Sequence, residues 1–167
     1  MWINRFLQKI GDAPVIYDST LVESSALELK KAMINKGYLN AEVSHNTTFK
    51  KKKAKVDYNI TANQPYRIKD IKYKIRNKEI EEIILPDTIN SLIKRGNLFD
   101  IDILEQERKR IAELLRTEGY FYFDKEYIGF VADTTLGNKQ VQLNMRVQPM
   151  RKVVGKNEIL RLEHEKY

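Results

Sequence analysis

The fold is decided by the stretch Asp18-Ser19-Thr20-Leu21 to Lys36-Gly37-Tyr38-Leu39, which returns later as Asp100-Ile101-Asp102-Ile103 to Glu118-Gly119-Tyr120-Phe121. The two aspartates lie 82 positions apart (100 − 18), and so do the two glycines (119 − 37). In both stretches an aspartate suited to a helix N-cap comes first, and a glycine suited to a helix end comes last. The sequence is therefore interpreted as two copies of one small domain.

The first copy is predicted to be helical and then extended. Apolar residues recur every three or four positions after Asp18, which indicates one face of a helix that Gly37 ends. Residues 43–49 and 54–62 are predicted to form a hairpin, because the second stretch alternates apolar and polar side chains. Residues 2–10 suit a preceding helix, and the opening strand of this copy is expected upstream of Met1.

The second copy predicts the complete order β-α-α-β-β. Strands are expected at 66–75, 122–131 and 141–147, a short helix from Asp87 to about Lys94, and a longer helix from Asp100 to Gly119. The apolar face of the long helix is expected to pack on the strands. The residues of this expected core are Leu104, Ile111, Leu114 and Leu115 on the helix, and Ile71, Tyr73, Val141, Leu143 and Met145 on the strands.

We expect the boundary between the two copies at Gln64-Pro65, because a matching Gln148-Pro149 follows the second copy. The predicted domains are residues 1–65 and 66–149, with 150–167 as a linker toward a third repeat. Each domain is expected to be α+β.

Composition excludes several kinds of chemistry. The chain has 167 residues and no cysteine, so disulfides, thiolate nucleophiles and cysteine zinc sites are impossible. His45 and His164 are the only histidines, and neither has a second histidine at ligand spacing, so surface or turn roles are expected for both. We therefore expect no enzyme, no catalytic or metal-binding residue and no cofactor.

The net charge is +7, and the basic residues concentrate at one place only. This basic patch consists of Lys50, Lys51, Lys52, Lys53 and Lys55. One interpretation is a solvated hairpin tip that prevents edge-to-edge aggregation. The other is contact with anionic lipid head groups or with an acidic protein.

The order of elements and several motifs resemble the polypeptide-transport-associated (POTRA) domain, in the tandem arrangement of the BamA/TamA superfamily of outer-membrane assembly barrels. The likeness covers about residues 1–150 and is nearest to TamA-like and TamL-like proteins. The motifs are Gly37-Tyr38-Leu39-Asn40-Ala41-Glu42-Val43, Pro65-Tyr66-Arg67-Ile68-Lys69-Asp70-Ile71, Gly96 to Phe99 with Leu104, Glu107, Arg108 and Arg110-Ile111, and Gly11-Asp12-Ala13-Pro14-Val15-Ile16-Tyr17-Asp18.

The resemblance implies a three-stranded mixed sheet in each repeat, covered on one face by two helices. It also implies a periplasmic scaffold that belongs to an outer-membrane protein. Its partners would be envelope proteins, unfolded outer-membrane protein clients and a C-terminal β-barrel of the same full-length protein.

The first strand of each hairpin is then expected at an open sheet edge, where a partner strand adds by backbone pairing. The expected edge residues are Val43, Ser44, His45, Phe49, Tyr127, Ile128 and Phe130. The alternative function is a basic α+β repeat that binds nucleic acid. We do not expect nucleic acid as a partner, because the chain lacks the Gly-x-x-Gly clamp and the stacking motif of common RNA-binding domains.

Overall fold

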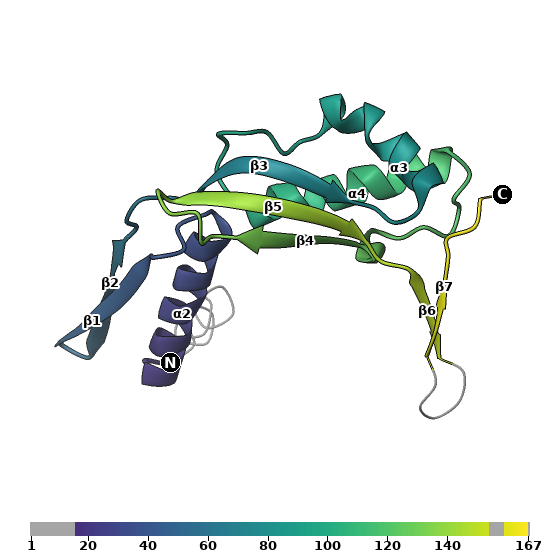
Figure 1. Ribbon diagram of the computed structural model, residues 1–167. Coiled ribbons are helices and arrows are strands. Elements are labelled where there is room, and N and C mark those ends of the chain that lie inside the picture. The colour runs from purple at the N-terminus through teal and green to yellow at the C-terminus, as the bar shows by residue number, and fades with distance from the viewer. Residues whose placement is uncertain (1–15, 154–158, 167) are drawn as a thin grey trace. The chain divides into compact units, whose positions relative to one another are not determined.

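The computed structural model describes residues 16–153 and 159–166 (Figure 1). The chain divides into two compact units, the first Met1–Lys30 with Glu42–Thr61 and the second Lys31–Ala41 with Ala62–Tyr167. No described helix combines the length and the apolar character that crossing a membrane requires. The predicted helix over residues 2–10 lies outside the described residues, and the expected domain boundaries stay predictions.

The two long helices repeat with the spacing that the sequence predicts. Helices α2 (Ser19–Asn35) and α4 (Ile101–Thr117) both have 17 residues, and their first residues lie 82 positions apart (101 − 19). A side-chain oxygen of Asp18 accepts a hydrogen bond from the Thr20 N–H at 2.8 Å, and Asp100 accepts one from Asp102 at the same distance. Both helices thus begin with an aspartate whose side chain bonds a backbone N–H of the first turn.

Both long helices also end in the same way. Gly37 and Gly119 have φ angles of +92° and +102°, the left-handed geometry of a glycine that ends a helix, as the sequence predicts for both positions. The Tyr38 N–H donates to the Met33 carbonyl at 3.0 Å, and the Tyr120 N–H donates to the Leu115 carbonyl at 2.9 Å. Each glycine therefore reverses the chain at a fixed point and starts the segment that leads to the hairpin.

The second unit has the predicted β-α-α-β-β order. Strands β3 (Arg67–Lys74), β4 (Ile128–Asp133) and β5 (Gln140–Val147) form a sheet in the order β3-β5-β4. β5 pairs with β3 in parallel and with β4 antiparallel. Helices α3 (Lys78–Ile84) and α4 lie over one face of this sheet (Figure 1). β6 (Met150–Val153) and β7 (Ile159–Leu162) follow as an antiparallel pair.

Two predicted elements are wrong in position. The short helix precedes Pro86, because the Asn77 side chain accepts hydrogen bonds from the N–H groups of Glu79 and Ile80 and so begins α3 there. After Pro86, only a 3-10 helix (η1, Pro86–Asn90) follows, in place of the helix expected from Asp87 to Lys94. β4 begins at Ile128 and not at 122, since a second 3-10 helix (η2, Lys125–Tyr127) comes first.

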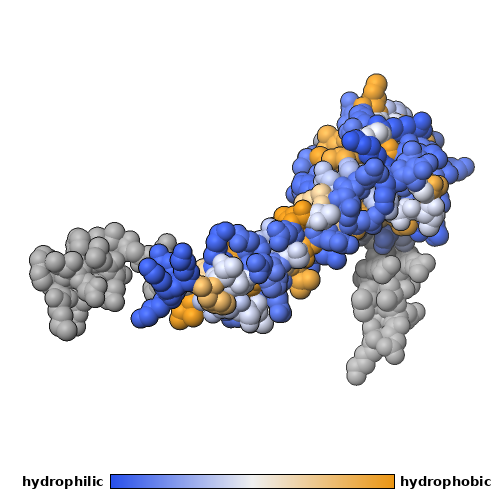
Figure 2. Space-filling view, turned by 90° about the vertical axis from the view of Figure 1, so that its left-hand side faces the viewer, coloured by the Kyte–Doolittle hydropathy of each residue, from blue (hydrophilic) through white to orange (hydrophobic). Residues whose placement is uncertain are grey.

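The core lies between the sheet and the helices of the second unit. Most of the expected core is buried: Leu104, Ile111, Leu115, Val141, Leu143 and Met145. Leu114, Ile71 and Tyr73 are only half-buried, so these three side chains lie at the margin of the core and not inside it. The phase expected for the helix holds, because Leu104, Ile111 and Leu115 are all buried. The visible face of the surface is mainly hydrophilic and carries separate small apolar patches (Figure 2).

The described part of the first unit is the start of α2 with a hairpin of β1 (Glu42–Lys50) and β2 (Lys53–Thr61). These strands pair antiparallel from Glu42↔Thr61 to Lys50↔Lys53, so the turn consists of Lys51 and Lys52 alone. Both have positive φ angles, +45° and +63°. Such a turn favours Asn-Gly, and left-handed geometry costs about 1–2 kcal/mol for each residue with a Cβ.

Leu115→Ala is expected to lower the free energy of unfolding by about 2–5 kcal/mol, because it leaves a cavity in the core. Leu114→Ala is the matched control and should cost about 1 kcal/mol, since its side chain is half-buried. Urea unfolding of the whole chain, followed by circular dichroism, measures both. Equal losses for the two variants would contradict the helix phase described above.

Gly37→Ala is expected to destabilise the protein more than Gly96→Ala. Both glycines have left-handed φ angles, but a Cβ at Gly37 would lie 2.7 Å from the Phe99 carbonyl oxygen, whereas nothing lies within 4 Å of one at Gly96. Gly96→Ala should therefore cost about 1 kcal/mol of backbone strain, and Gly37→Ala about 3 kcal/mol or more. Thermal unfolding compares them, and a larger loss at Gly96 would contradict this account.

Candidate functional site

The sheet of the second unit has two outer edges, and the edge at β3 is partly covered. The segment Gly96–Phe99 runs alongside its first half. The Ile68 N–H donates to the Asn97 carbonyl at 2.9 Å, and the Ile68 carbonyl accepts from the Gly96 N–H at 2.7 Å. The Tyr66 carbonyl accepts from the Phe99 N–H at 3.0 Å. A partner strand therefore finds this half of the β3 edge already paired.

The edge at β4 is open within the described residues, because no described segment pairs with β4 on the side away from β5. The Tyr127 carbonyl accepts from the Gln148 N–H at 2.7 Å and so faces β5. Backbone groups of an antiparallel pair alternate, so Phe130 and Ala132 direct their N–H and C=O groups outward. The Ile128 N–H donates to the Lys125 carbonyl where η2 ends and is not available.

A groove of about 350 Å³ lies between this open edge and the first half of α4. Its apolar lining comes from both elements, and its charged lining comes from α4 and η2. The lining residues are Ile101, Leu104, Glu105 and Arg108 on α4, and Glu126, Ile128, Gly129, Phe130 and Gln148 on the strand side. The site thus has outward backbone groups beside a surface that is partly apolar and partly charged.

An ion-pair network fixes the position of η2 against α4. The Arg108 guanidinium bonds Glu105 at 2.7 Å and Glu126 at 2.9 Å, and it also donates to the Lys125 carbonyl at 3.1 Å. Lys125 in turn donates to Glu105. The hydrogen bond from Lys125 holds the pKa of Glu105 below its ordinary value, and the same bond raises the pKa of Lys125.

The structure brings together one of the two predicted sets of edge residues. Tyr127, Ile128 and Phe130 lie at the end of η2 and on β4, at the open edge. Sequence reasoning missed the residues of α4 that form the other wall of the groove. Ile101, Leu104, Glu105 and Arg108 share one helix stripe, because they are three or four positions apart. That spacing is visible in the sequence, but the adjacency of the stripe to β4 is not.

The other predicted set, Val43, Ser44, His45 and Phe49, lies on β1 of the first unit. β1 pairs with β2 along its whole length, and no other described strand pairs with either of them. The two residues that flank a two-residue turn, here Lys50 and Lys53, form a hydrogen-bonded pair. Every second residue before Lys50, including Ser44, therefore directs its backbone N–H and C=O groups toward β2. Val43, His45 and Phe49 therefore direct their backbone groups away from β2.

The basic patch lies at the tip of this hairpin. Lys50 ends β1, Lys51 and Lys52 form the turn, and Lys53 begins β2. Lys55 differs from the others because its ammonium group pairs with Asp57 at 2.7 Å.

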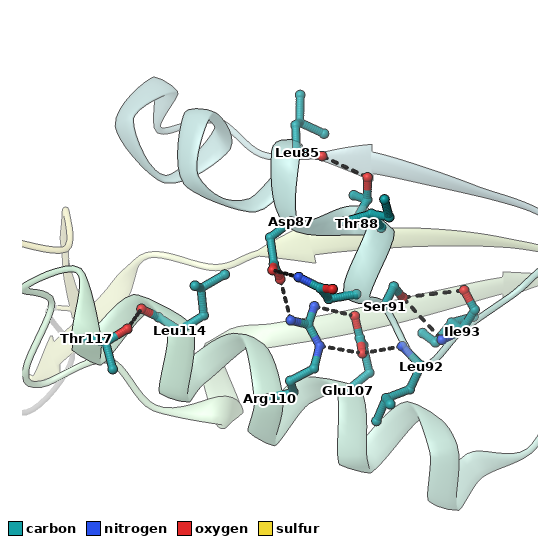
Figure 3. A network of polar contacts seen from close by, with 12 residues as sticks. Leu85, Asp87, Thr88, Ser91, Leu92, Ile93, Glu107, Arg110, Leu114 and Thr117 are labelled. Carbon is teal, nitrogen blue, oxygen red and sulfur yellow. Dashed lines mark hydrogen bonds and ion pairs between the residues drawn. The ribbon is translucent and has the colours of Figure 1, made fainter.

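The buried polar groups of the second unit are held by structural contacts. Glu107 is 1% exposed, and its carboxylate accepts from the Leu92 N–H at 2.9 Å and from Arg110 at 2.9 and 3.0 Å (Figure 3). Hydrogen bonds to Glu107 and Asp87 raise the pKa of Arg110 against the effect of burial. The described residues contain no group of three or more acidic or histidine side chains that could hold a metal ion.

His164 is buried, so the expected surface or turn role is wrong for this residue. Its Nε2 lies 2.8 Å from the Gln148 carbonyl oxygen. Its ring is 4.6 Å from the rings of both Phe123 and Tyr127. The hydrogen bond satisfies the Nε2 atom, and the two aromatic rings pack against the imidazole. His164 therefore has a packing role.

Comparison with known proteins gives a match to one family model. The model is POTRA, described as surface antigen variable number repeat, and it matches residues 5–63 and 66–150. Comparison with curated proteins gives no match. Similar solved structures include BamA from Haemophilus ducreyi lacking POTRA domains 1–3, with 14% identity and a TM-score of 0.47, and POTRA3–5 of Haemophilus influenzae BamA, with 15% identity and a TM-score of 0.48.

The alignments cover 81% and 80% of this chain but only 24% and 52% of those two chains. The resemblance to TamA-like and TamL-like proteins stays a prediction.

The second unit is expected to lose stability in acid through Glu105. The folded pKa is below the ordinary value of 4.5, so the unfolded chain binds the proton more readily. Stabilisation by Glu105 is fully present above the unfolded pKa and is lost as the pH falls through the folded pKa. Thermal midpoints between pH 6 and pH 3 (about the range on both sides of a glutamate pKa) measure the loss.

Glu105→Gln should lower the thermal midpoint at the upper pH of this range. The midpoint of this variant should also fall less steeply as the pH decreases. Glu113→Gln is the control, because it removes an exposed carboxylate of α4 that does not contact Lys125. An unchanged acid dependence in Glu105→Gln would contradict the role given to the network.

Proposed function

The chain belongs to the POTRA family of surface antigen variable number repeats, and from this premise we propose that it is a non-enzymatic scaffold of an outer-membrane protein assembly or translocation barrel. In this role it works in the periplasm and connects envelope proteins and unfolded outer-membrane protein clients to a C-terminal β-barrel of the same full-length protein. The observation that supports the proposal most is the open β4 edge beside a groove with both apolar and charged lining residues.

The mechanism is addition of a partner strand to β4. The outward backbone groups of Phe130 and Ala132 supply donors and acceptors at alternate positions, which is the spacing that an added strand requires. The covered half of the β3 edge makes β4 the better of the two outer strands. Backbone pairing needs no particular side chain, so one edge accepts many sequences.

The groove adds a preference for strands that alternate apolar and polar residues. Every second side chain of an added strand lies on the helix-covered side of the sheet, above Ile101, Leu104 and Phe130. The intervening side chains lie on the opposite face of the sheet. Strands of outer-membrane barrels have this alternation, because one face contacts lipid and the other faces the barrel interior. The site is therefore suited to such strands before they insert.

The hairpin of the first unit provides a second edge of the same kind. Val43, His45 and Phe49 direct backbone groups outward on β1, and Phe49 adds an exposed aromatic ring. Two weak edges on one chain bind a long unfolded client better than either edge alone, because the second contact forms at a raised effective concentration.

Disulfide cross-linking tests the β4 edge directly, because the chain has no cysteine and gives no background. Ala132→Cys is mixed with peptides from an outer-membrane barrel strand, each with one cysteine at a different position. Cβ atoms of directly paired strands are about 4.5–5.5 Å apart, which is near the geometry of a disulfide. We expect cross-linking several-fold above that of the control Arg67→Cys, which lies on the covered half of β3. Equal cross-linking from both strands would exclude β4 as the preferred edge.

Ala132→Pro removes one outward donor and leaves the ladder to β5 in place. We expect about a tenfold loss of peptide affinity, measured by fluorescence anisotropy, from one lost hydrogen bond and a changed edge. Ala132→Ser is the control, because it keeps the N–H. If the proline variant is folded by circular dichroism and binds the peptide as the wild type does, strand addition at β4 is wrong.

A further inference from the structure

We propose that the lysine tip, defined as Lys50, Lys51, Lys52 and Lys53, binds the surface of an anionic phospholipid bilayer. This inference concerns the first unit and is separate from strand pairing at β4. It rests on four observations about the tip: its backbone, its unpaired charge, its apolar surroundings and the kind of cation that it uses.

The turn of the tip has the usual geometry of a two-residue hairpin, but lysine is an unfavourable residue for that geometry. Lys51 and Lys52 both have left-handed φ angles in a two-residue turn for which Asn-Gly is the favoured sequence. Lysine gains nothing from this geometry, because its Cβ approaches the backbone and its long side chain bonds no neighbour there. Strained residues of this kind point to a function of the side chain. The side chains of Lys51 and Lys52 supply a positive charge at the end of a long, flexible chain.

The charge of the tip is not neutralised by the protein. No ion pair joins Lys50, Lys51, Lys52 or Lys53 to any residue that the structure describes, although Lys55 two positions further on pairs with Asp57. All four side chains are exposed. Four neighbouring positive charges without an acidic partner sum to a strongly positive potential at the tip. This potential attracts an anionic surface.

Apolar side chains lie next to these charges. Phe49 is 68% exposed and its ring contacts Tyr17 edge-on at 5.0 Å. Ile16 and Leu21 are 83% and 59% exposed within the described residues. Both line a groove of about 740 Å³ that Lys52 and Lys53 also line. Charges beside exposed aromatic and aliphatic groups suit the boundary between lipid head groups and acyl chains.

The choice of lysine favours a membrane over an acidic protein. The tip contains four lysines and no arginine. Protein interfaces are enriched in arginine and depleted in lysine, because the guanidinium forms two parallel hydrogen bonds with a carboxylate. Lysine acts as a flexible point charge, which fits a surface of mobile phosphate groups without fixed positions.

The test uses the double variant Lys51→Asn, Lys52→Gly, which installs the favoured turn sequence and lowers the net charge by two. Its stability should equal or exceed that of the wild type, because the strain is relieved. The matched control is Lys69→Gln, Lys74→Gln on β3, which removes two exposed lysines of the second unit. Binding is measured by co-sedimentation with phosphatidylcholine vesicles that contain or lack phosphatidylglycerol, at low and at high salt.

We expect the wild type and the control to bind the anionic vesicles at low salt and to bind neutral vesicles poorly. The tip variant should bind the anionic vesicles about 30-fold less tightly, if each lysine contributes as basic residues near such surfaces usually do. Equal binding of the tip variant and the wild type would overturn the proposal. So would equal binding to both kinds of vesicle, or no vesicle binding together with tip-dependent binding to soluble polyglutamate, which would indicate an acidic protein instead.

Discussion

The left-handed glycine at the end of each long helix is the constraint on which the rest of the fold depends. At Gly37 and Gly119 the chain leaves the helix at a fixed point, and the next residue's N–H closes the last turn.

At Gly37 the missing side chain has a second use. The Gly37 carbonyl accepts a hydrogen bond from the Tyr66 N–H at 2.8 Å, and the Phe99 carbonyl approaches closer than a Cβ would allow. Beside it, Lys36 pairs with Asp100 and Asp102 at 3.0 and 2.7 Å. The segment Lys31–Ala41 therefore belongs to the second unit through backbone contacts as well as charge.

The two outer edges of the sheet in the second unit differ because only β3 is paired with a further segment of the chain. Residues 96–99 return along β3 between η1 and α4 and use its outward groups, whereas the chain reaches β4 through a 3-10 turn and leaves its outer side uncovered. The ion pairs around Arg108 then hold that turn on α4. β4 is therefore held along its inner side by the central strand β5 and, at its beginning, by the charged network around η2.

The sequence was sufficient for features that depend on local chemistry. The repeat, the aspartate caps, the two glycine turns and the alternating strand β5 all follow from residue type and spacing.

The sequence was insufficient for features that depend on tertiary packing. The α3 helix is only seven residues long, and its cap is a single asparagine, so Pro86 and Asp87 gave the stronger local signal. Phe123 is an aromatic residue in a stretch that suits a strand, but it is buried in the core ahead of β4. The groove residues of α4 could not be found because their role depends on which strand lies beside them.

The buried contact of His164 has a consequence for how this chain tolerates change in length. The Nε2 atom of His164 lies 2.8 Å from the Gln148 carbonyl oxygen, so the chain before β6 and the chain after β7 meet at the same place. The pair β6 and β7 lies between these two points. Insertions or deletions in that excursion leave its entry and exit where they are, as in other loops whose ends are close together. Such changes in length would therefore leave the contact between Gln148 and His164 in place.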